Sequence, residues 1–398
     1  MVPSLAMGGM ERVCVNYANL LYERGYHVTL MNLTTDAEMI IEKLNKNIIY
    51  HKNIAQRVPT FFRTSLLNII KGRFRLCNIE KWLKSINPER LYKLLITDNP
   101  NQFDIEIAFY GGHMMRVISG SNQKNSIKIG WIHSPAIEKH FHFFKSFISA
   151  RDTYLKMDIL MCVSEEVKEK AEKLFGKEVN AKVLYNPNNT KLIRELSKKR
   201  ITDVSYNRFT FINASRLEFE IKGYDLLIDS CKRLKDNGYE FDLWIIGDGE
   251  GKSSILQLIE EYQLQDTVHY LGPKDNPYCY LSKADCYICS SRSEGFSMVV
   301  AESVIIGTPV VSTDVSGARE MLGDSEYGLI VKNSGEGIYL GMKKVLSDTK
   351  YWEHLKEQAQ KRKDFLNEEN IMNSFEGIIQ EEIRGREHAQ IKHHHACV

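Results

Sequence analysis

Two glutamates flank the start of a predicted helix in the second half of the chain. An apolar run at 285–289 is typical of a buried strand, and the segment from Ser290 to Gly295 then turns into a helix that ends near Gly307. Glu294 lies in the loop and Glu302 in the helix. Backbone N–H groups at a helix N-terminus favour an anion, and carboxylates accept hydrogen bonds from sugar hydroxyls at roughly 1.5–3 kcal/mol each. The pattern fits a ligand with hydroxyls at both ends and phosphate between them, and equally a surface helix with ordinary acidic residues.

A pair of cations lies in the loop after another predicted strand, 209–213. Arg216 and Lys222 precede a helix at about 224–237. In a parallel sheet this loop opens on the same edge as the loop at 291–297, because both follow the carboxyl ends of strands. Two such cations can neutralise a diphosphate without a metal, and arginine adds bidentate geometry. The alternative is a pair of surface charges.

Two further features follow predicted strands. Gly247, Gly249 and Gly251 have G-x-G-x-G spacing rather than the G-x-G-x-x-G of a dinucleotide site, so we interpret them as a tight strand-to-helix turn near a ligand. His133 ends the apolar run 127–132, where open parallel sheets bind ligands. A lone histidine is nevertheless more often structural.

The elements that must position these residues alternate between strand and helix. A length of 398 residues predicts two domains. The alternation predicts two doubly wound, Rossmann-like α/β domains with parallel sheets. The first opens with a short strand at Val2, a Gly8-Gly9 loop, a helix and a second strand. We divide the chain into an N-terminal domain, a linker, a C-terminal domain, a helix that returns to the first domain, and a disordered tail, at 1–187, 188–207, 208–367, 368–387 and 388–398.

Composition excludes several classes of protein. Apolar residues at 43% and charged residues at 26% are typical of a globular protein, and no segment approaches the ~18 apolar residues of a membrane-spanning helix. Eight cysteines without regular spacing predict reduced thiols in a cytoplasm. Cys286 and Cys289 form a C-x-x-C inside a predicted strand, where core packing is the favoured interpretation. His393 to His395 resemble a metal-binding tract but lie in the predicted tail.

The segment 52–93 is strongly basic. It holds ten basic and two acidic residues, with aromatic and aliphatic side chains interleaved among them. Such a mixture suits an anionic membrane surface, or simply a solvated helical face. Nucleic acid is disfavoured because no recognised nucleic-acid motif is present.

Together these motifs resemble the retaining glycosyltransferases of family four, which have the GT-B fold of two domains facing across a cleft. The resemblance covers most of the chain and is strongest at about 209–322. It is carried by the following segments: Gly8-Gly9-Met-Glu-Arg12, Trp131-Ile-His133, Asn213-Ala-Ser-Arg216 with Lys222-Gly223, Ile246-Gly-Asp-Gly249, Ser290 to Ser297 with Glu302, and Gly307-Thr-Pro-Val-Val. The Glu-(x)7-Glu element is specific in this context, whereas the glycine turns alone are not.

The resemblance implies a role for each candidate residue. Arg216 and Lys222 would bind the donor diphosphate, Glu294 the transferred sugar and Glu302 the ribose, while His133 would orient the donor from the other domain. The remaining implied donor-binding residues are Gly8, Gly9, Gly249, Gly295, Phe296 and Ser297. Ser297 departs from the family, in which glycine or proline is common at this position. The identity of the donor sugar is therefore not carried over from the family.

The sequence therefore predicts a cytoplasmic, membrane-peripheral, bacterial-type glycosyltransferase of surface-polysaccharide synthesis. We expect a UDP-sugar donor, retention of configuration, a lipid-linked or other glycan acceptor, and no metal or other cofactor. A sugar-nucleotide epimerase of the same fold and a non-catalytic scaffold remain as alternatives. The epimerase would need acid and base residues around the sugar, and beyond His133 the sequence offers no such cluster.

Overall fold

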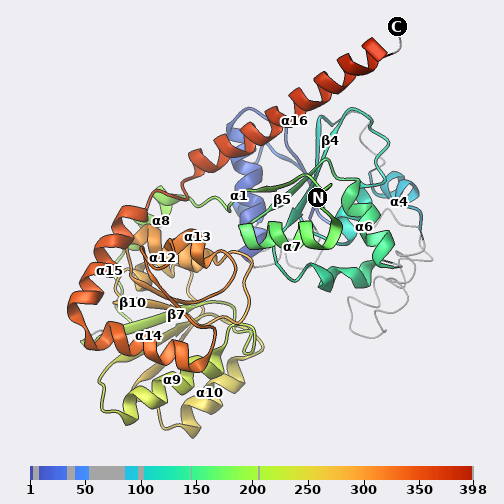
Figure 1. Cartoon of the computed structure of the whole chain (residues 1–398). Coiled ribbons are helices and arrows are strands. Elements are labelled where there is room, and N and C mark those ends of the chain that lie inside the picture. The colour runs from blue at the N-terminus through green and yellow to red at the C-terminus, as the bar shows by residue number, and fades with distance from the viewer. Residues whose placement is uncertain are drawn as a thin grey trace. The chain divides into compact units, whose positions relative to one another are not determined.

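The chain divides into two compact units, each built of parallel strands and helices. The computed structural model describes residues 1–2, 9–33, 41–52, 86–96, 103–144, 146–204 and 207–396. Unit 1 comprises Met1–Tyr185 together with Ile371–Val398, and unit 2 comprises Asn186–Asn370 (Figure 1). The predicted α/β class with two doubly wound units is confirmed.

Unit 1 contains two parallel sheets among its described residues. One has the order β3-β4-β5-β6 and the other pairs β1 with β2. The N-terminal residues lie between the two sheets, because the Val2 N–H donates to the Met31 carbonyl while the Phe109 N–H donates to the Met1 carbonyl. The strands are β1 (Thr29–Met31), β2 (Ile49–His51), β3 (Ile105–Ala108), β4 (Ile127–Ile132), β5 (Ile159–Cys162) and β6 (Ala181–Val183).

The helices of unit 1 include one from the far end of the sequence. They are α1 (Gly9–Glu23), η1 (Ile41–Lys43), α4 (Pro88–Leu95), α5 (His113–Ile118), η3 (Ile137–Phe143), α6 (Phe147–Leu155), α7 (Glu165–Phe175) and α16 (Glu368–Ala396). The Phe375 ring of α16 stacks on Trp131 with centroids 6.4 Å apart, and Glu376 pairs with Arg24 at 2.9 Å. The last helix therefore completes the core of unit 1, as the sequence predicted.

Unit 2 is organised around one six-stranded parallel sheet. Its order is β12-β11-β10-β7-β8-β9, so the chain starts at the centre, builds one half and then returns to build the other. The strands are β7 (Thr210–Ala214), β8 (Asp242–Ile246), β9 (Val268–Gly272), β10 (Cys286–Cys289), β11 (Val310–Thr313) and β12 (Leu329–Val331). The helices are α8 (Thr190–Ser197), α9 (Tyr224–Asp236), α10 (Lys252–Glu261), α11 (Tyr278–Leu281), α12 (Met298–Ile306), α13 (Ala318–Leu322), α14 (Gly335–Ser347) and α15 (Thr349–Arg362).

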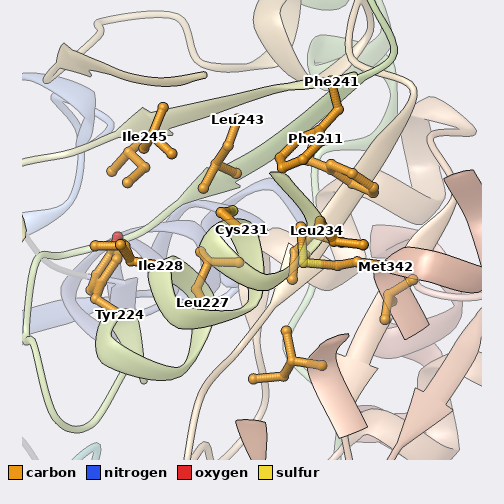
Figure 2. Packing of buried hydrophobic residues seen from close by; sticks show 14 of the residues in the cluster. Phe211, Tyr224, Leu227, Ile228, Cys231, Leu234, Phe241, Leu243, Ile245 and Met342 are labelled. Atoms are coloured by element: carbon orange, nitrogen blue, oxygen red, sulfur yellow. The ribbon is translucent and has the colours of Figure 1, made fainter. Parts of the chain in front are cut away.

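The core of unit 2 forms where α9 and α14 pack on this sheet. Leu227, Ile228 and Leu234 lie on one face of α9 and are fully buried, as expected for apolar residues at helical spacing. They meet strand side chains such as Phe211 and Leu243 (Figure 2). Burying each such side chain contributes roughly 1.5–3 kcal/mol. This core holds β7 and β10 in place, and the candidate residues lie in the loops that follow these two strands.

Two of the predicted segment assignments were wrong. The predicted linker 188–207 contains α8, which packs on α11 and α12 inside unit 2. Asn189 caps this helix by accepting a hydrogen bond from the Leu192 N–H, and Ile193 is buried on its inner face. The predicted disordered tail is helical as far as Ala396. No glycine or proline follows Gly385 to end that helix.

Candidate functional site

The candidate residues of unit 2 lie at the point where its strand order reverses. β7 and β10 are neighbours in the sheet, although β8 and β9 lie between them in sequence. The loop after β7 carries Arg216 and Lys222, and the loop after β10 carries Glu294. In open parallel sheets this reversal leaves a crevice beyond the carboxyl ends of the two strands, where ligands bind. The predicted convergence of the two loops is therefore present.

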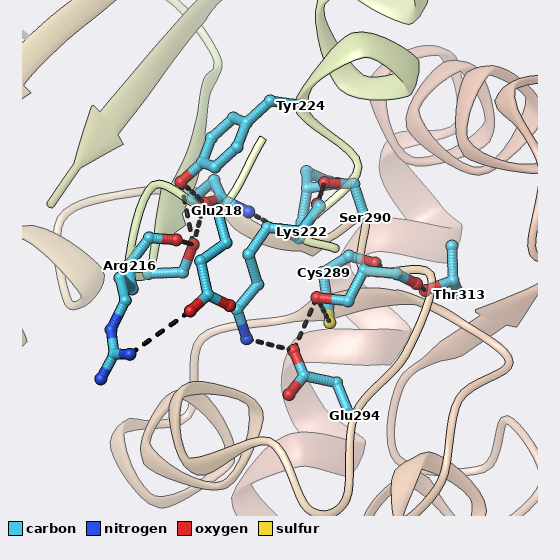
Figure 3. A network of polar contacts seen from close by, with 12 residues as sticks. Arg216, Glu218, Lys222, Tyr224, Cys289, Ser290, Glu294 and Thr313 are labelled. Atoms are coloured by element: carbon cyan, nitrogen blue, oxygen red, sulfur yellow. Dashed lines mark hydrogen bonds and ion pairs between the residues drawn. The ribbon is translucent and has the colours of Figure 1, made fainter. Parts of the chain in front are cut away.

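Lys222 and Glu294 form an ion pair across these two loops. Lys222 Nζ lies 2.7 Å from Glu294 Oε1, and the side chains are 19% and 12% exposed (Figure 3). Burial acts to lower the pKa of Lys222, but the neighbouring Glu294 carboxylate more than offsets it, so the pKa is raised above its ordinary value. Lys222 is consequently charged at neutral pH.

Two hydroxyls that the sequence analysis did not single out support Glu294: one contacts its carboxylate and the other contacts the residue that does so. The Ser291 hydroxyl donates to Glu294 Oε1 at 2.6 Å, and the Thr313 hydroxyl donates to the Ser291 carbonyl at 2.6 Å. Lys222 and Ser291 both donate to Oε1 of Glu294, so Oε2 accepts no hydrogen bond from the described residues. The arrangement leaves Oε2 available to hydroxyls of a ligand. Ser291 is the second residue after the buried strand β10, which is the signal that could have singled it out.

Gly223 allows the two loops to approach at the level of the backbone. Its φ is +65°, and a Cβ at this position would lie 2.1 Å from the Ser290 carbonyl oxygen. The Ser290 hydroxyl donates to the Lys222 carbonyl at 2.8 Å, and the Arg292 N–H donates to the Ile221 carbonyl at 2.8 Å. Only glycine fits this close approach.

Arg216 lies on the same loop as Lys222, but more exposed. Its guanidinium pairs with Glu218 at 3.3 Å, and the arginine side chain is 52% exposed. The start of the loop is anchored by Asn213, which donates to the Ile288 carbonyl and accepts from the Tyr224 hydroxyl, both at 2.8 Å. The loop is thus fixed at its base, and the half-exposed arginine head group is held by Glu218.

The glycine turn packs against the Arg216 loop. Gly247 has a φ of +142°, and a Cβ there would lie 1.9 Å from the Ser215 carbonyl oxygen. The Leu217 N–H donates to the Asp248 carbonyl at 2.9 Å, and the Gly251 N–H donates to the Leu217 carbonyl at 2.7 Å. Gly249 also lies against Leu217, with a φ of +154°. These glycines serve close loop packing, in agreement with the interpretation as a tight turn.

The second glutamate lies inside α12. Glu302 is 4% exposed and accepts a hydrogen bond from the Tyr278 hydroxyl at 3.2 Å. Gly295 is in the loop before the helix, Phe296 is buried against Gly317, and Ser297 precedes the first helical residue without a side-chain cap. The backbone N–H groups of the first turn of α12 therefore have no side-chain acceptor from Ser297.

His133 lies in unit 1, directly after β4. Its Nε2 lies 3.0 Å from the Phe109 carbonyl oxygen, which can only accept, so Nε2 carries the proton and Nδ1 is an acceptor. The ring is parallel to that of Trp131, with centroids 6.2 Å apart. Burial lowers the pKa of His133 to about 4. The imidazole is therefore neutral at physiological pH.

The other predictions for unit 1 are only partly covered by the described residues. Gly9 is the first residue of α1, and a Cβ at this position would meet no atom within 4 Å. Gly8 and most of the basic segment 52–93, namely 53–85, lie outside the described residues. Cys286 and Cys289 are both buried in β10 without a disulfide, as expected for core residues. The described residues contain no group of three potential metal ligands.

The chain is similar in sequence to known glycosyltransferases. Residues 195–362 match the family model described as glycosyl transferases group 1. A Campylobacter jejuni protein, N-acetylgalactosamine-N,N'-diacetylbacillosaminyl-diphospho-undecaprenol 4-alpha-N-acetylgalactosaminyltransferase, is 35% identical over 182 residues, which are 45% of this chain and 48% of that protein. The chain spans about half the length of the curated relatives that it matches most strongly.

Two solved structures share the fold over nearly the whole chain. Sucrose-phosphate synthase from Thermosynechococcus elongatus has a TM-score of 0.74 at 17% identity and covers 95% of this chain and 94% of its own. Anabaena Alr3699/HepE in complex with UDP and glucose has a TM-score of 0.71 at 16% identity and covers 95% and 98%. The two doubly wound units thus define the GT-B fold. The family match over 195–362 and the shared fold confirm the resemblance to the family-four glycosyltransferases seen in the sequence.

Proposed function

We propose that the protein transfers a sugar from a nucleoside diphosphate, a UDP-sugar in our proposal, to a lipid-linked or other glycan acceptor in surface-polysaccharide synthesis. The Lys222–Glu294 pair at the switch point of unit 2 carries this proposal. It places a cation for a diphosphate next to an acceptor for sugar hydroxyls. The Campylobacter relative is named for transfer to an undecaprenol-linked sugar, and Alr3699/HepE was solved with UDP and glucose.

The proposed chemistry depends on stabilising the departing diphosphate. Lys222 and the exposed Arg216 neutralise its charge, and Arg216 offers a two-pronged contact. The donor site therefore needs no metal in this proposal. Because these cations are held before the ligand arrives, their attraction grows as the leaving group gains charge in the transition state.

Glu294 holds the sugar during this step. Its Oε1 is occupied by Lys222 and Ser291, so Oε2 accepts the sugar hydroxyls. Glu302 binds the ribose, and the first turn of α12, after Gly295, faces sugar or phosphate. His133 is neutral, so it contributes a hydrogen-bond acceptor at Nδ1 rather than a positive charge. The acceptor attacks from the face that the diphosphate leaves, which retains the configuration of the sugar.

We further propose that the protein works at the inner face of the membrane. None of the described helices is both long enough and apolar enough to cross a bilayer. The basic and aromatic segment 52–93 has the composition of an anionic membrane contact. Binding to vesicles that increases with their anionic lipid content supports this proposal, and binding that ignores it removes the claim.

Incubating the protein with radiolabelled nucleotide sugars tests the proposed function. We expect release of UDP and transfer of label only when a polyprenyl-diphosphate-linked sugar is added as acceptor. Isomerisation of the donor without transfer would instead support the epimerase. Absence of any nucleotide binding would support the scaffold. The anomeric configuration of the product, read by NMR, decides between retention and inversion.

A further inference from the structure

Residues 273–282, which we call the wall, lie outside the predicted site and contact Glu302 through Tyr278. The segment 273–277 follows β9 and therefore lies on the same edge of the sheet as the loops after β7 and β10. It leads into α11, whose first residue, Tyr278, donates its hydroxyl to Glu302 Oε1 at 3.2 Å. Tyr278 therefore links Glu302 to this wall.

The end of α8 is joined to this wall by two hydrogen bonds. Asn276 Nδ2 donates to the Leu196 carbonyl at 3.0 Å, and the Ser282 hydroxyl donates to the Ser197 carbonyl at 2.7 Å. These carbonyls belong to the last turn of α8, where a helix supplies few backbone donors, and the Leu196 carbonyl also accepts from the Lys199 N–H at 3.2 Å. The wall therefore completes the end of α8, and α8 in turn fixes both sides of Tyr278.

Asp203 adds a charged contact just beyond α8. Its carboxylate accepts from the Tyr280 hydroxyl at 2.7 Å and pairs with Lys274 Nζ at 2.7 Å. The Lys274 ammonium also lies over the Tyr280 ring, 5.3 Å from its centre. Lys274 and Tyr280 stand on either side of Tyr278 in the chain, so one carboxylate holds both flanks of the residue that contacts Glu302.

We infer that Asp203 is a positioning residue for the nucleoside end of the donor site, acting through Tyr278 on Glu302. The inference rests on the proposed function, in which Glu302 binds the ribose of a nucleoside diphosphate. Asp203 itself does not touch the ligand. Its loss lets Tyr278 move, and Glu302 then meets the ribose in a less favourable arrangement.

Isothermal titration of the full chain with UDP tests this inference through a double-mutant cycle. Asp203→Ala and Tyr278→Phe should each raise the Kd for UDP about three- to tenfold, which is less than the loss of a direct hydrogen bond to a charged group, because neither side chain contacts the ligand. The double variant should raise it no more than the larger single change, because both substitutions interrupt one route. In turnover, KM for the donor should rise while kcat changes little.

A matched control separates positioning from general stability. Asp266 pairs with Lys235 at 2.6 Å, as Asp203 pairs with Lys274, but it lies before β9 at the opposite edge of the sheet. Asp266→Ala should leave the Kd unchanged even if it lowers the thermal midpoint as much as Asp203→Ala does. If Asp203→Ala fails to fold, Asp203→Asn takes its place, since it keeps an acceptor for Tyr280 and loses only the charge.

The possible outcomes distinguish this inference from the function on which it depends. An unchanged Kd in the Asp203 variant overturns the inference alone, provided that the parent protein binds UDP. Multiplying effects in the double variant also overturn it, because they show independent actions. Failure of the parent protein to bind UDP or any other nucleoside diphosphate removes the proposed function and the inference together.

Discussion

If Lys222 binds a diphosphate as proposed, the charge balance of the Lys222–Glu294 pair sets how strongly the site attracts that ligand. Both side chains are largely buried and lie 2.7 Å apart, so each neutralises much of the field of the other. An incoming diphosphate must compete with Glu294 for the lysine, and the sugar must engage the other carboxylate oxygen. Binding and turnover therefore make opposite demands on Glu294.

Replacing Glu294 with glutamine should separate these demands. Glu294→Gln keeps an acceptor for Ser291 but removes the charge that neutralises Lys222, so UDP should bind several-fold more tightly. At the same time kcat should fall about ten- to a hundredfold, because a charged hydrogen bond to the reacting sugar is lost. Calorimetry and initial rates measure the two effects. Intact turnover would show that the assignment of Glu294 to the sugar is wrong.

The matched control for this substitution is an exposed ion pair between the loop after β10 and the first turn of α9. Arg292 pairs with Asp225 at 2.6 Å, with side chains 40% and 36% exposed. Such pairs contribute about 0–1 kcal/mol. Asp225→Asn should leave both the UDP affinity and kcat near their original values. A change as large as that of Glu294→Gln would mean that loop position, rather than the charge on Glu294, governs both quantities.

At the scale of elements, α9 begins at a glycine that brings two loops together. Gly223 precedes α9 and Gly238 follows it, and both have positive φ, +65° and +77°. A side chain at either position costs about 1–2 kcal/mol of backbone strain. Only at Gly223 would the added Cβ also strike a neighbouring backbone, at Ser290. The two glycines therefore form a matched pair for testing the loop contact.

We expect Gly223→Ala and Gly238→Ala to differ in function more than in fold. Both should lower the free energy of unfolding, measured by denaturant titration, and Gly223→Ala by the larger amount. Only Gly223→Ala should weaken UDP binding, because displacing Ser290 moves Lys222 and Glu294 apart. Equal UDP affinity in the two variants would contradict the proposed dependence of the site on this contact.

Most elements could be predicted from the sequence because buried strands and helices leave strong patterns. The apolar run at 127–132 became β4 with the same bounds, and the helix predicted at about 224–237 is α9, Tyr224–Asp236. α8 was missed because Asn186-Pro-Asn-Asn and its polar neighbours are typical of a connection. Its buried face holds Ile193, and its other stabilising contacts come from distant segments that local pattern does not reveal.

The charged residues of the candidate site could be predicted from the sequence, but the hydrogen bonds that hold them in place could not. Arg216, Lys222 and Glu294 could be placed on one edge because parallel strands share the direction of their carboxyl ends. The hydrogen bond from the Thr313 hydroxyl to the Ser291 carbonyl depends on β10 and β11 being neighbours. The contact of Asp203 with Tyr280 joins residues far apart in sequence. Such contacts follow from the packed fold, and serine, threonine and aspartate are common on any surface.

At the scale of the whole molecule, the two units have separate cores, and they differ in how many segments of the sequence form them. Unit 2 is one uninterrupted segment, whereas unit 1 needs the end of the chain. Beyond Phe375 and Glu376, α16 is held to unit 1 by ion pairs of Lys182 with Glu381 at 3.0 Å and of Arg386 with Asp158 at 2.7 Å. Two cores of this kind should unfold in separate steps.

Phe375→Ala should lower the stability of unit 1 alone. Phe375 is fully buried against Trp131, and removal of such a ring costs about 3–5 kcal/mol. In calorimetry, UDP should raise the transition of unit 2, because a ligand stabilises the unit that binds it. Phe375→Ala should lower the other transition and leave the UDP affinity unchanged. A single transition that responds to both UDP and Phe375→Ala would show that the two units unfold as one cooperative body.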